Sequence, residues 1–157
     1  MEVAKKKVLV FGMGISGIGA AGLLEEQGAE VTLYDGNEKL EEEKIRGKLG
    51  AGSKAQIVIG PFPEELLDTL DIVVLSPGVP TDLPIVEQIR ERGILVMGEV
   101  ELAYESGKGD VLAITGTNGK TTTTALLGEI MKNYQDDVFV VGNIGNPYTT
   151  AAGKMSG

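Results

Sequence analysis

The sequence predicts the α/β class of fold, from two observations. Short apolar runs alternate along the chain with segments of helical periodicity, which is the pattern of parallel strands joined by helical crossovers. Two glycine-rich loops each lie between an apolar run and a helical segment, where phosphate-binding loops are found. Together they predict a Rossmann-like, mostly parallel five-stranded sheet with helices on both faces, followed by the start of a phosphate-loop (P-loop) α/β domain.

The expected elements follow one another in regular order. The five strands of the main sheet are expected at the apolar runs covering residues 7–11, 30–34, 56–59, 71–75 and 94–97. Helices are expected between and after them, around residues 18–24, 38–50, 83–92 and 99–105. The polar, glycine-containing segment from Ser106 to Gly109 is the best boundary, and divides a first domain (1–108) from the N-terminal piece of a second (109–157). In that piece, strands are expected at 110–115 and 138–141, on either side of a helix at 121–133.

The composition is that of an ordinary globular protein with an acidic balance. The chain of 157 residues is 42% hydrophobic and 24% charged, and its 23 glycines and 4% aromatic residues suit an aliphatic core with many tight turns. Its 23 Asp and Glu residues outnumber the 14 Lys and Arg residues, and the net charge of −9 argues against nucleic acid as a partner. Because the chain has neither cysteine nor histidine, it cannot supply disulfides, thiolate nucleophiles, Cys/His metal sites or Ser-His-Asp triads.

The N-terminal segment has some features of a secretory signal. Three lysines at residues 5–7 precede an uncharged run from Val8 to Leu24. Glycines interrupt this run repeatedly, however, and it leads without a cleavage-type spacer into Glu25 and Glu26 and another strand pattern. We therefore expect a cytoplasmic protein with no membrane insertion.

The first glycine loop, GMGISG at residues 12–17, has the spacing GxGxxG. In this pattern the first glycine allows a tight turn, the second lets a diphosphate approach the backbone, and the third lets the helix pack closely on the strand. The amides of Ile15 and Ser16 are expected to face an anion at the positive end of the helix dipole. Asp35, at the end of the second strand, can accept a hydrogen bond from a ribose hydroxyl or a base N–H. The loop predicts a nucleotide diphosphate site and leaves open whether the nucleotide is NAD or another.

The second glycine loop lies within the run ITGTNGKTTTT at residues 114–124. It departs from the common Walker spacing, which would require a glycine at Ile114, and has a shorter TGTNGKTT form. Lys120 is expected to act as the catalytic residue by bridging the outer phosphates of ATP, and Thr121 to give its hydroxyl to Mg²⁺. The expected ATP-binding residues are Gly116, Thr117, Asn118, Gly119, Lys120, Thr121 and Thr122.

With both loops and several shorter motifs, the chain resembles the N-terminal part of the Mur ligases, the ATP-dependent amide-bond ligases of peptidoglycan precursor synthesis. The shorter motifs that carry the resemblance are Asp35, SPGV at residues 76–79, GEVEL at 98–102 and GNIG at 142–145. Within the family the chain is most similar to the ligases that add D-glutamate. Those that add L-alanine usually carry histidine where this chain has Asn118.

The resemblance implies that the first domain binds the UDP end of UDP-N-acetylmuramoyl-L-alanine and not NAD. The residues implied to bind this substrate are Gly14, Ile15, Ser16, Gly17, Asp35, Gly36, Asn37, Ser76, Pro77, Gly78 and Asn143. ATP and Mg²⁺ are implied to phosphorylate the terminal carboxylate of the substrate, after which the amine of D-glutamate attacks the acyl phosphate. Some relatives carry threonine and arginine where this chain has Gly36 and Asn37, so the sequence departs from the pattern at the uracil contacts.

The resemblance further implies a remainder of the ligase chain, which would complete the ATP site and bind D-glutamate. The chain is accordingly interpreted as an N-terminal fragment that is inactive alone. Two other interpretations remain open at this point. An NAD-dependent Rossmann oxidoreductase would explain the first loop only, and would need a catalytic acid or base that the sequence does not supply. A nucleotide-sensing module would explain uridine nucleotide binding without turnover.

Overall fold

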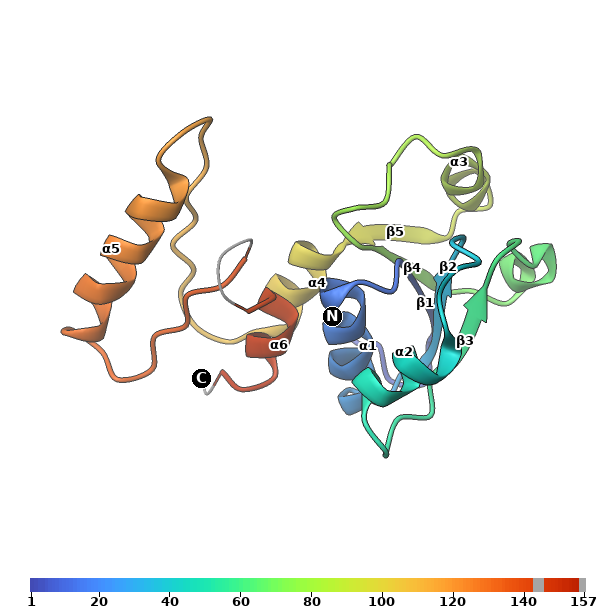
Figure 1. Ribbon diagram of the computed structural model, residues 1–157, viewed down its shortest axis with the longest axis horizontal. Coiled ribbons are helices and arrows are strands. Elements are labelled where there is room, and N and C mark those ends of the chain that lie inside the picture. Colours follow the sequence, from blue (N-terminus) through green and yellow to red (C-terminus); the bar gives the residue numbers. More distant parts are fainter. Residues whose placement is uncertain (143–145, 156–157) are drawn as a thin grey trace.

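The computed structural model describes residues 1–142 and 146–155 and shows a parallel sheet flanked by helices, with a helical arm beside it (Figure 1). The strands are β1 (Lys7–Phe11), β2 (Glu30–Asp35), β3 (Gln56–Ile59), β4 (Ile72–Leu75) and β5 (Leu95–Gly98). Their order in the sheet is β3-β2-β1-β4-β5, and every pair is parallel. In the register, Val8 of the central strand lies between Val31 of β2 and Ile72 of β4. The predicted α/β fold with a five-stranded parallel sheet is confirmed.

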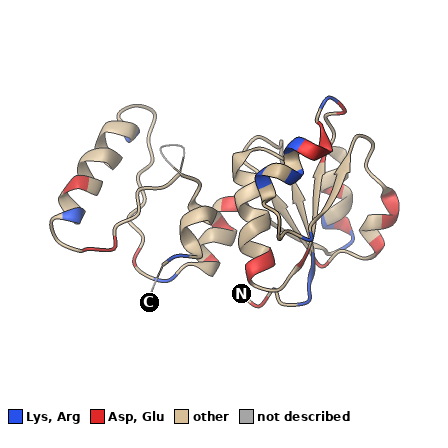
Figure 2. Ribbon diagram, turned by 60° about the horizontal axis from the view of Figure 1, so that its bottom comes forward, with Lys and Arg blue, Asp and Glu red and all other residues tan. Residues whose placement is uncertain are grey.

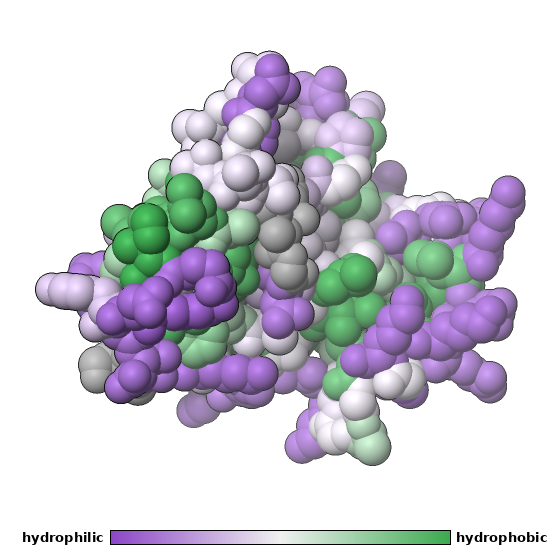
Figure 3. Space-filling view, turned by 60° about the vertical axis from the view of Figure 1, so that its left-hand side comes forward, coloured by the Kyte–Doolittle hydropathy of each residue, from purple (hydrophilic) through white to green (hydrophobic). Residues whose placement is uncertain are grey.

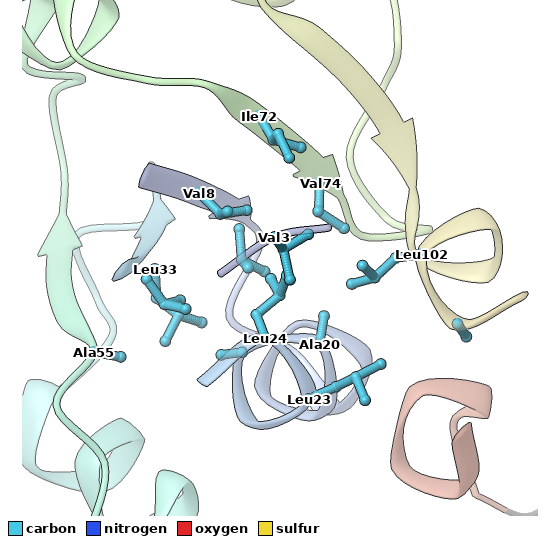
Figure 4. Close-up of a cluster of buried hydrophobic side chains, with 14 of the residues drawn as sticks. Val3, Val8, Ala20, Leu23, Leu24, Leu33, Ala55, Ile72, Val74 and Leu102 are labelled. Atoms are coloured by element: carbon cyan, nitrogen blue, oxygen red, sulfur yellow. The ribbon is translucent and has the colours of Figure 1, made fainter. Parts of the chain in front are cut away.

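Helices cover both faces of the sheet, as the alternation of side chains along a strand requires. Val8 and Val10 of β1 face the core under α1 (Ile15–Glu26), α2 (Glu42–Leu49) and α4 (Glu99–Ser106), where Leu24, Leu33 and Leu102 converge (Figure 4). On the opposite face, Leu9 and Phe11 face α3 (Pro84–Glu91) and the 3₁₀ helix η1 (Glu64–Asp68). The α3 helix begins with Pro84, whose fixed φ suits the first helical position.

The remaining two helices belong to the C-terminal part of the chain. Helix α5 (Lys120–Lys132) lies in a segment, residues 107–142, that we call the P-loop arm and that stands apart from the sheet in Figure 1. Helix α6 (Tyr148–Ala152) returns to the sheet domain and packs against α1 and α4. Exposed apolar side chains of the arm include Leu126 and Ile130 on α5, which are 61% and 56% exposed. Figure 3 views the molecule from this side and shows hydrophobic patches on its surface.

Several predicted elements differ from the observed ones. The strands expected at residues 110–115 and 138–141 are wrong: the first segment has no regular structure, and the second contributes only an isolated bridge from Val141 to Asn146. Their sequences are strand-like, but a strand exists only where a neighbouring strand supplies hydrogen-bond partners, and neither segment meets one among the described residues. Helix α2 begins four residues later than expected, at Glu42, and neither η1 nor α6 was predicted.

Charged residues of both signs are mixed along the described part of the chain. Lys and Arg residues are interspersed with Asp and Glu over the helices and loops (Figure 2). Exposed salt bridges such as Lys44–Glu41 and Arg46–Glu42 on α2 contribute little to stability. Within the described part of the chain, no helix is long and apolar enough to cross a membrane.

Candidate nucleotide-binding sites

The main cavity lies at the carboxyl ends of β1 and β4, where the strand order reverses direction. Chain connections leave this point toward opposite edges of the sheet, which opens a crevice above the strand ends. The cavity has a volume of about 460 Å³, which is in the range of small-molecule sites. Its lining residues are Phe11, Gly12, Met13, Gly14, Ile15, Ser16, Asp35, Ser76, Pro77, Gly78, Val79, Pro80 and Leu83.

The first glycine loop is shaped by close contacts at Gly12 and Gly17. Gly12 has a φ of +103°, and its N–H donates to the carbonyl of Tyr34 over 2.7 Å. A Cβ at this position would lie 2.9 Å from Cβ of Ser76. At Gly17 a Cβ would lie only 1.9 Å from the carbonyl oxygen of Gly12. Both glycines are therefore required by the fold of the loop, and Gly17 supports the site from below without lining the cavity.

The N-terminus of α1 points its first amides toward the cavity. The helix begins at Ile15 after Gly14, and its first i to i−4 hydrogen bond runs from Ile18 N–H to the Gly14 carbonyl over 3.0 Å. The amides of Ile15 and Ser16 precede that bond, so they have no acceptor within the helix. Ile15 is 78% exposed and its amide lies at the positive end of the helix dipole. This arrangement can bind an anion through backbone amides, without a lysine or arginine side chain.

Asp35 is the one charged residue among those that line the cavity. Its Oδ2 accepts from Met13 N–H over 3.0 Å, and its Oδ1 accepts from Asn37 N–H over 2.9 Å. These bonds fix the carboxylate at the end of β2 while leaving lone pairs on both oxygens. A carboxylate repels phosphate, so an anionic ligand in this cavity would place its phosphates at α1 and its hydroxyl or N–H donors at Asp35.

The turn after β4 forms the facing wall of the cavity. Ser76 is buried, its N–H donates to the carbonyl of Phe11 over 3.0 Å, and its Oγ donates to the carbonyl of Gly12 over 3.3 Å. Val79 N–H donates to the carbonyl of Ser76 over 2.9 Å, which closes the turn around Pro77 and Gly78. Ser76 thus connects the turn to the glycine loop. These two segments, far apart in the sequence, form one surface.

The candidate residues of this first site therefore fall into three groups. The seven that line the cavity are Gly14, Ile15, Ser16, Asp35, Ser76, Pro77 and Gly78. Three do not line the cavity: Gly17, which packs against the Gly12 carbonyl, and Gly36 and Asn37, which are exposed beside Asp35. The Asn37 side chain accepts from Lys39 N–H over 3.2 Å. Asn143 lies outside the described residues. The sequence interpretation did not name Met13, Val79, Pro80 or Leu83 as site residues, although the apolar VP pair directly after SPG could have indicated this wall.

Tyr34 supports the end of β2 below Asp35. Its ring makes edge-to-face contacts with Phe11 and Phe62, with centroids 4.8 and 4.9 Å apart, and its hydroxyl donates to the carbonyl of Gly60 over 3.1 Å. Burial, and to a lesser extent the negative charge of Asp35, raises the pKa of Tyr34. The phenol therefore stays neutral and donating at physiological pH, which holds the strand end in place.

The second glycine loop presents a different set of donors. Gly119 adopts a φ of +77° and α5 begins at Lys120. The Lys120 ammonium donates to the carbonyls of Gly116 and of Thr117, the latter over 3.2 Å, so it folds back over its own loop. Thr121 and the loop residues are exposed. Exposed backbone amides, an ammonium and a hydroxyl at a helix N-terminus are the donor set that polyphosphate requires, so these residues fit ATP.

Metal binding at the second loop depends on few protein atoms. In the described residues no group of three or more acidic, histidine or cysteine side chains could hold a metal ion. The Thr121 hydroxyl is the protein oxygen that the motif offers, so a magnesium ion here would take its other ligands from nucleotide phosphates and water.

A parallel sheet with a glycine loop at its switch point, an aspartate after β2 and a facing turn after β4 defines a Rossmann-like α/β domain with a candidate nucleotide site at the strand ends. Residues 6–98 match the family model described as "Mur ligase MurD-like, N-terminal domain". This match covers more than half of the chain, and the chain belongs to the MurD-like Mur ligases.

Individual relatives agree with this assignment. The chain is 56% identical over 156 residues to a UDP-N-acetylmuramoylalanine--D-glutamate ligase of Lachnospira eligens, a match that covers 99% of this chain and 34% of the relative. It is also 56% identical over 149 residues to the ligase of the same name from Lachnoclostridium phytofermentans, covering 95% and 33%. The chain thus spans about a third of the length of the curated relatives it matches.

Solved structures support the fold. A murein peptide ligase Mpl from Psychrobacter arcticus is similar with a TM-score of 0.54 and 23% identity, over 82% of this chain and 27% of that one. A pseudomurein peptide ligase type C from Methanothermus fervidus is similar with a TM-score of 0.53 and 24% identity, over 82% and 26%. At this identity the likeness concerns the fold alone.

Proposed function

We propose that this chain is the N-terminal part of an ATP-dependent ligase that joins D-glutamate to UDP-N-acetylmuramoyl-L-alanine in peptidoglycan precursor synthesis. The sheet domain would bind the UDP end of the muramoyl substrate, and the P-loop arm would supply one side of the ATP site. The names of the relatives at 56% identity support the substrates. The remainder of the ligase chain would complete the ATP site and bind D-glutamate. We place the reaction in the cytoplasm.

The observation that carries the proposal is the crevice at the switch point. There the amides of Ile15 and Ser16 and the carboxylate of Asp35 lie in one cavity with the Ser76 turn as its wall. The amides suit the diphosphate, and the carboxylate suits a base N–H or ribose hydroxyl. Because no lysine or arginine is among the described residues that line the cavity, we attribute affinity for the anionic end to the helix N-terminus and the loop backbone.

The arm would act in the first step of the reaction, the phosphorylation of the substrate carboxylate, through positioning and charge. Lys120 would hold the outer phosphates and offset the negative charge that builds on the transferred group. The loop amides from Gly116 to Gly119 would orient the same phosphates, and Thr121 would hold Mg²⁺, which supplies further charge neutralisation when bound. The loop supplies only one side of the ATP site, and phosphoryl transfer also needs groups on the other side that hold the metal and align the attacking carboxylate, so we expect no turnover from the 157 residues alone.

Two alternatives predict different ligands. An NAD-dependent oxidoreductase would need a catalytic acid or base in the crevice. Asp35 is the one titratable residue among the described residues that line it, and two backbone N–H groups hold its carboxylate where it would contact a ribose or base. This alternative is therefore disfavoured. A nucleotide-sensing module would bind uridine nucleotides through the same crevice but would have no use for the second loop.

Calorimetric titration of the purified chain with UDP, UDP-N-acetylmuramoyl-L-alanine, NAD and ATP tests the proposal. We expect UDP and the muramoyl nucleotide to bind and NAD to bind weakly or not at all. Tight binding of NAD, with no heat from either uridine nucleotide, would show that the assignment of the crevice is wrong.

Substitution of Asp35 tests the orientation of the ligand in the crevice. Asp35→Ala should weaken UDP binding by about 1–3 kcal/mol, because a base or ribose donor loses its acceptor. Glu30→Ala removes a carboxylate from the other end of β2, outside the cavity, and is the matched control. Equal UDP affinity in native, Asp35→Ala and Glu30→Ala chains would contradict the role given to Asp35.

A further inference from the structure

Helix α1 has a second contact surface, one turn beyond the amides that face the cavity. Gly19 follows Ile15 by four residues, or about 6 Å along the helix axis. A Cβ at Gly19 would lie 2.8 Å from Oγ1 of Thr149 and 3.0 Å from Oγ1 of Thr150. The absence of a side chain at Gly19 therefore lets α6 approach the backbone of α1 closely, and the two helices are neighbours in Figure 1.

Helix α6 is anchored by a buried carboxyl group from the sheet domain. Glu99, the first residue of α4, is 5% exposed, and Thr149 is 2% exposed. Oε1 of Glu99 accepts from Oγ1 of Thr149 over 2.8 Å and from Thr149 N–H over 3.3 Å. A buried carboxyl group is unfavourable unless hydrogen bonds compensate for its lost solvation. The placement of α6 that lets Thr149 donate to Glu99 is therefore favoured over placements that leave Glu99 without these bonds.

Helix α1 needs support on this side because its sequence is a weak helix former. Gly17, Gly19 and Gly22 all lie within it, and each has a lower helix propensity than alanine. Beyond Gly19, the C-terminal end of α6 continues the contact: a Cβ at Gly153 would lie 2.9 Å from Oε2 of Glu26 and 3.6 Å from Cδ1 of Leu23. The segment from Pro147 to Gly153 thus covers α1 from its second turn to its last residue.

We propose that α6 is a brace for α1, that Glu99 is the positioning residue that holds the brace through Thr149, and that the brace sets the affinity of the α1 N-terminus for a nucleotide diphosphate. A helix whose first amides are ordered before binding loses less conformational entropy when the diphosphate arrives. By linkage, the bound nucleotide in turn stabilises α6 on the sheet domain. The identity of the ligand rests on the proposed function, whereas the support of α1 by α6 does not.

The test compares two neighbouring threonines in the whole chain. Thr149→Val removes the hydroxyl that Glu99 accepts from while keeping the shape of the side chain, and Thr149→Ser keeps the hydroxyl. Thr150→Val makes the same change at the neighbouring threonine, which also lies against Gly19 but is exposed and makes no bond to Glu99, so it controls for the loss of a hydroxyl at this contact. We expect Thr149→Val to raise the calorimetric Kd for UDP roughly five-fold or more, the lower range of coupling between sites. Thr149→Ser and Thr150→Val should bind as the native chain does.

Hydrogen exchange of α1 and α6 in the same variants provides the second readout. Thr149→Val should exchange faster over residues 15–26 and 148–152, and UDP should slow exchange over 148–152 in the native chain. Glu99→Gln retains Oε1 as an acceptor and should behave as native, whereas Glu99→Ala should behave as Thr149→Val.

Two results would overturn the inference. One is faster exchange of α6 in Thr149→Val with an unchanged Kd for UDP, which would separate the brace from the nucleotide site. The other is hydrogen exchange of α1 that is the same in Thr149→Val as in the native chain. This result would show that α6 does not support α1, whether or not the chain binds UDP. Failure of the native chain to bind UDP would refute the proposed function, and the exchange of α1 would then decide the brace independently.

Discussion

The sheet domain and the P-loop arm present the same local sequence pattern, an apolar run followed by a glycine loop and a helix, and the two regions fold differently. In the sheet domain, the residues of β1 from Val8 onward are buried and pair with β2 and β4. In the arm, Val111 and Leu112 of the corresponding run are exposed and form no strand. The difference shows that the pattern specifies a candidate strand, and that hydrogen-bonding neighbours determine whether it forms.

The two glycine loops differ in the same way. The first loop is fixed by bonds to other elements: Gly12 to Tyr34 of β2, Met13 to Asp35, and Ser76 back to Gly12. The second loop is closed by Lys120 bonding to carbonyls of its own loop. Pre-organised donors bind more tightly than donors that must be ordered by the ligand. The first loop is therefore expected to bind its ligand in this chain, and the second to need further protein around it.

The largest expected contrast between the regions is in hydrogen exchange. Amides of β1 should exchange only on global unfolding, whereas amides from Val111 to Thr115 should exchange almost freely, a difference on the order of a thousandfold or more. Helix α6 should be better protected than α5, because it packs on α1 and α4. Similar protection of β1 and of the arm, measured by mass spectrometry, would show that the arm is covered in solution.

Substitution of the P-loop lysine tests whether the arm acts once it is completed. In the full-length ligase, Lys120→Ala should lower turnover by a factor on the order of a hundred or more, since a placed positive charge at the transferred phosphate is lost. Lys132→Ala, at the other end of α5 and paired with Glu129, is the control and should retain activity. A fully active Lys120→Ala enzyme would contradict the assigned role, as would ligase turnover by the 157-residue chain.

A matched pair of glycine substitutions tests how tightly the first loop is built. Gly17→Ala places a Cβ 1.9 Å from the Gly12 carbonyl oxygen, and should lower the free energy of unfolding by about 1–3 kcal/mol. Gly22→Ala lies in the same helix with no atom within 4 Å of the added Cβ. It should raise the free energy of unfolding by up to about 1 kcal/mol through helix propensity. Denaturant titration measures both, and equal effects of the two changes would refute the steric account.

Alkaline pH tests the contact of α6 with the sheet domain. Burial, and to a lesser extent Tyr104, raises the pKa of Tyr148 above its usual 10.0. The stabilisation that comes with this raised pKa is complete below pH 10, and is lost as the pH rises through the folded-state pKa. Between pH 8 and pH 11 the melting temperature should fall by a few degrees less in Tyr148→Phe than in the native chain. An equal fall in melting temperature in both proteins would show that the ionisation of Tyr148 does not weaken the contact of α6 with the sheet domain.

Much of the first site was accessible from sequence, because its parts are local signals. GxGxxG after an apolar run and Asp35 at the end of the next strand each predict a strand end, and parallel strands bring their carboxyl ends to one edge. SPG was assigned to the site through the resemblance to the Mur ligases, since on its own it predicts only a turn after a strand. The apolar wall at Val79, Pro80 and Leu83 was not predicted: the VP pair directly after SPG was an available signal, but an apolar residue after a turn fits the core as well as a cavity wall.

By itself, the sequence determined the five strands of the sheet and the position of the first glycine loop. Each strand is a short apolar run with its own turn signals, so its formation follows from residues close in the chain. Tertiary structure alone decided that α6 packs on α1, that Glu99 meets Thr149, and that the strand-like segments of the arm stay unpaired. Those outcomes depend on residues distant in the sequence. The pattern of apolar residues within one segment contains no information on whether such a partner lies beside it in the folded chain.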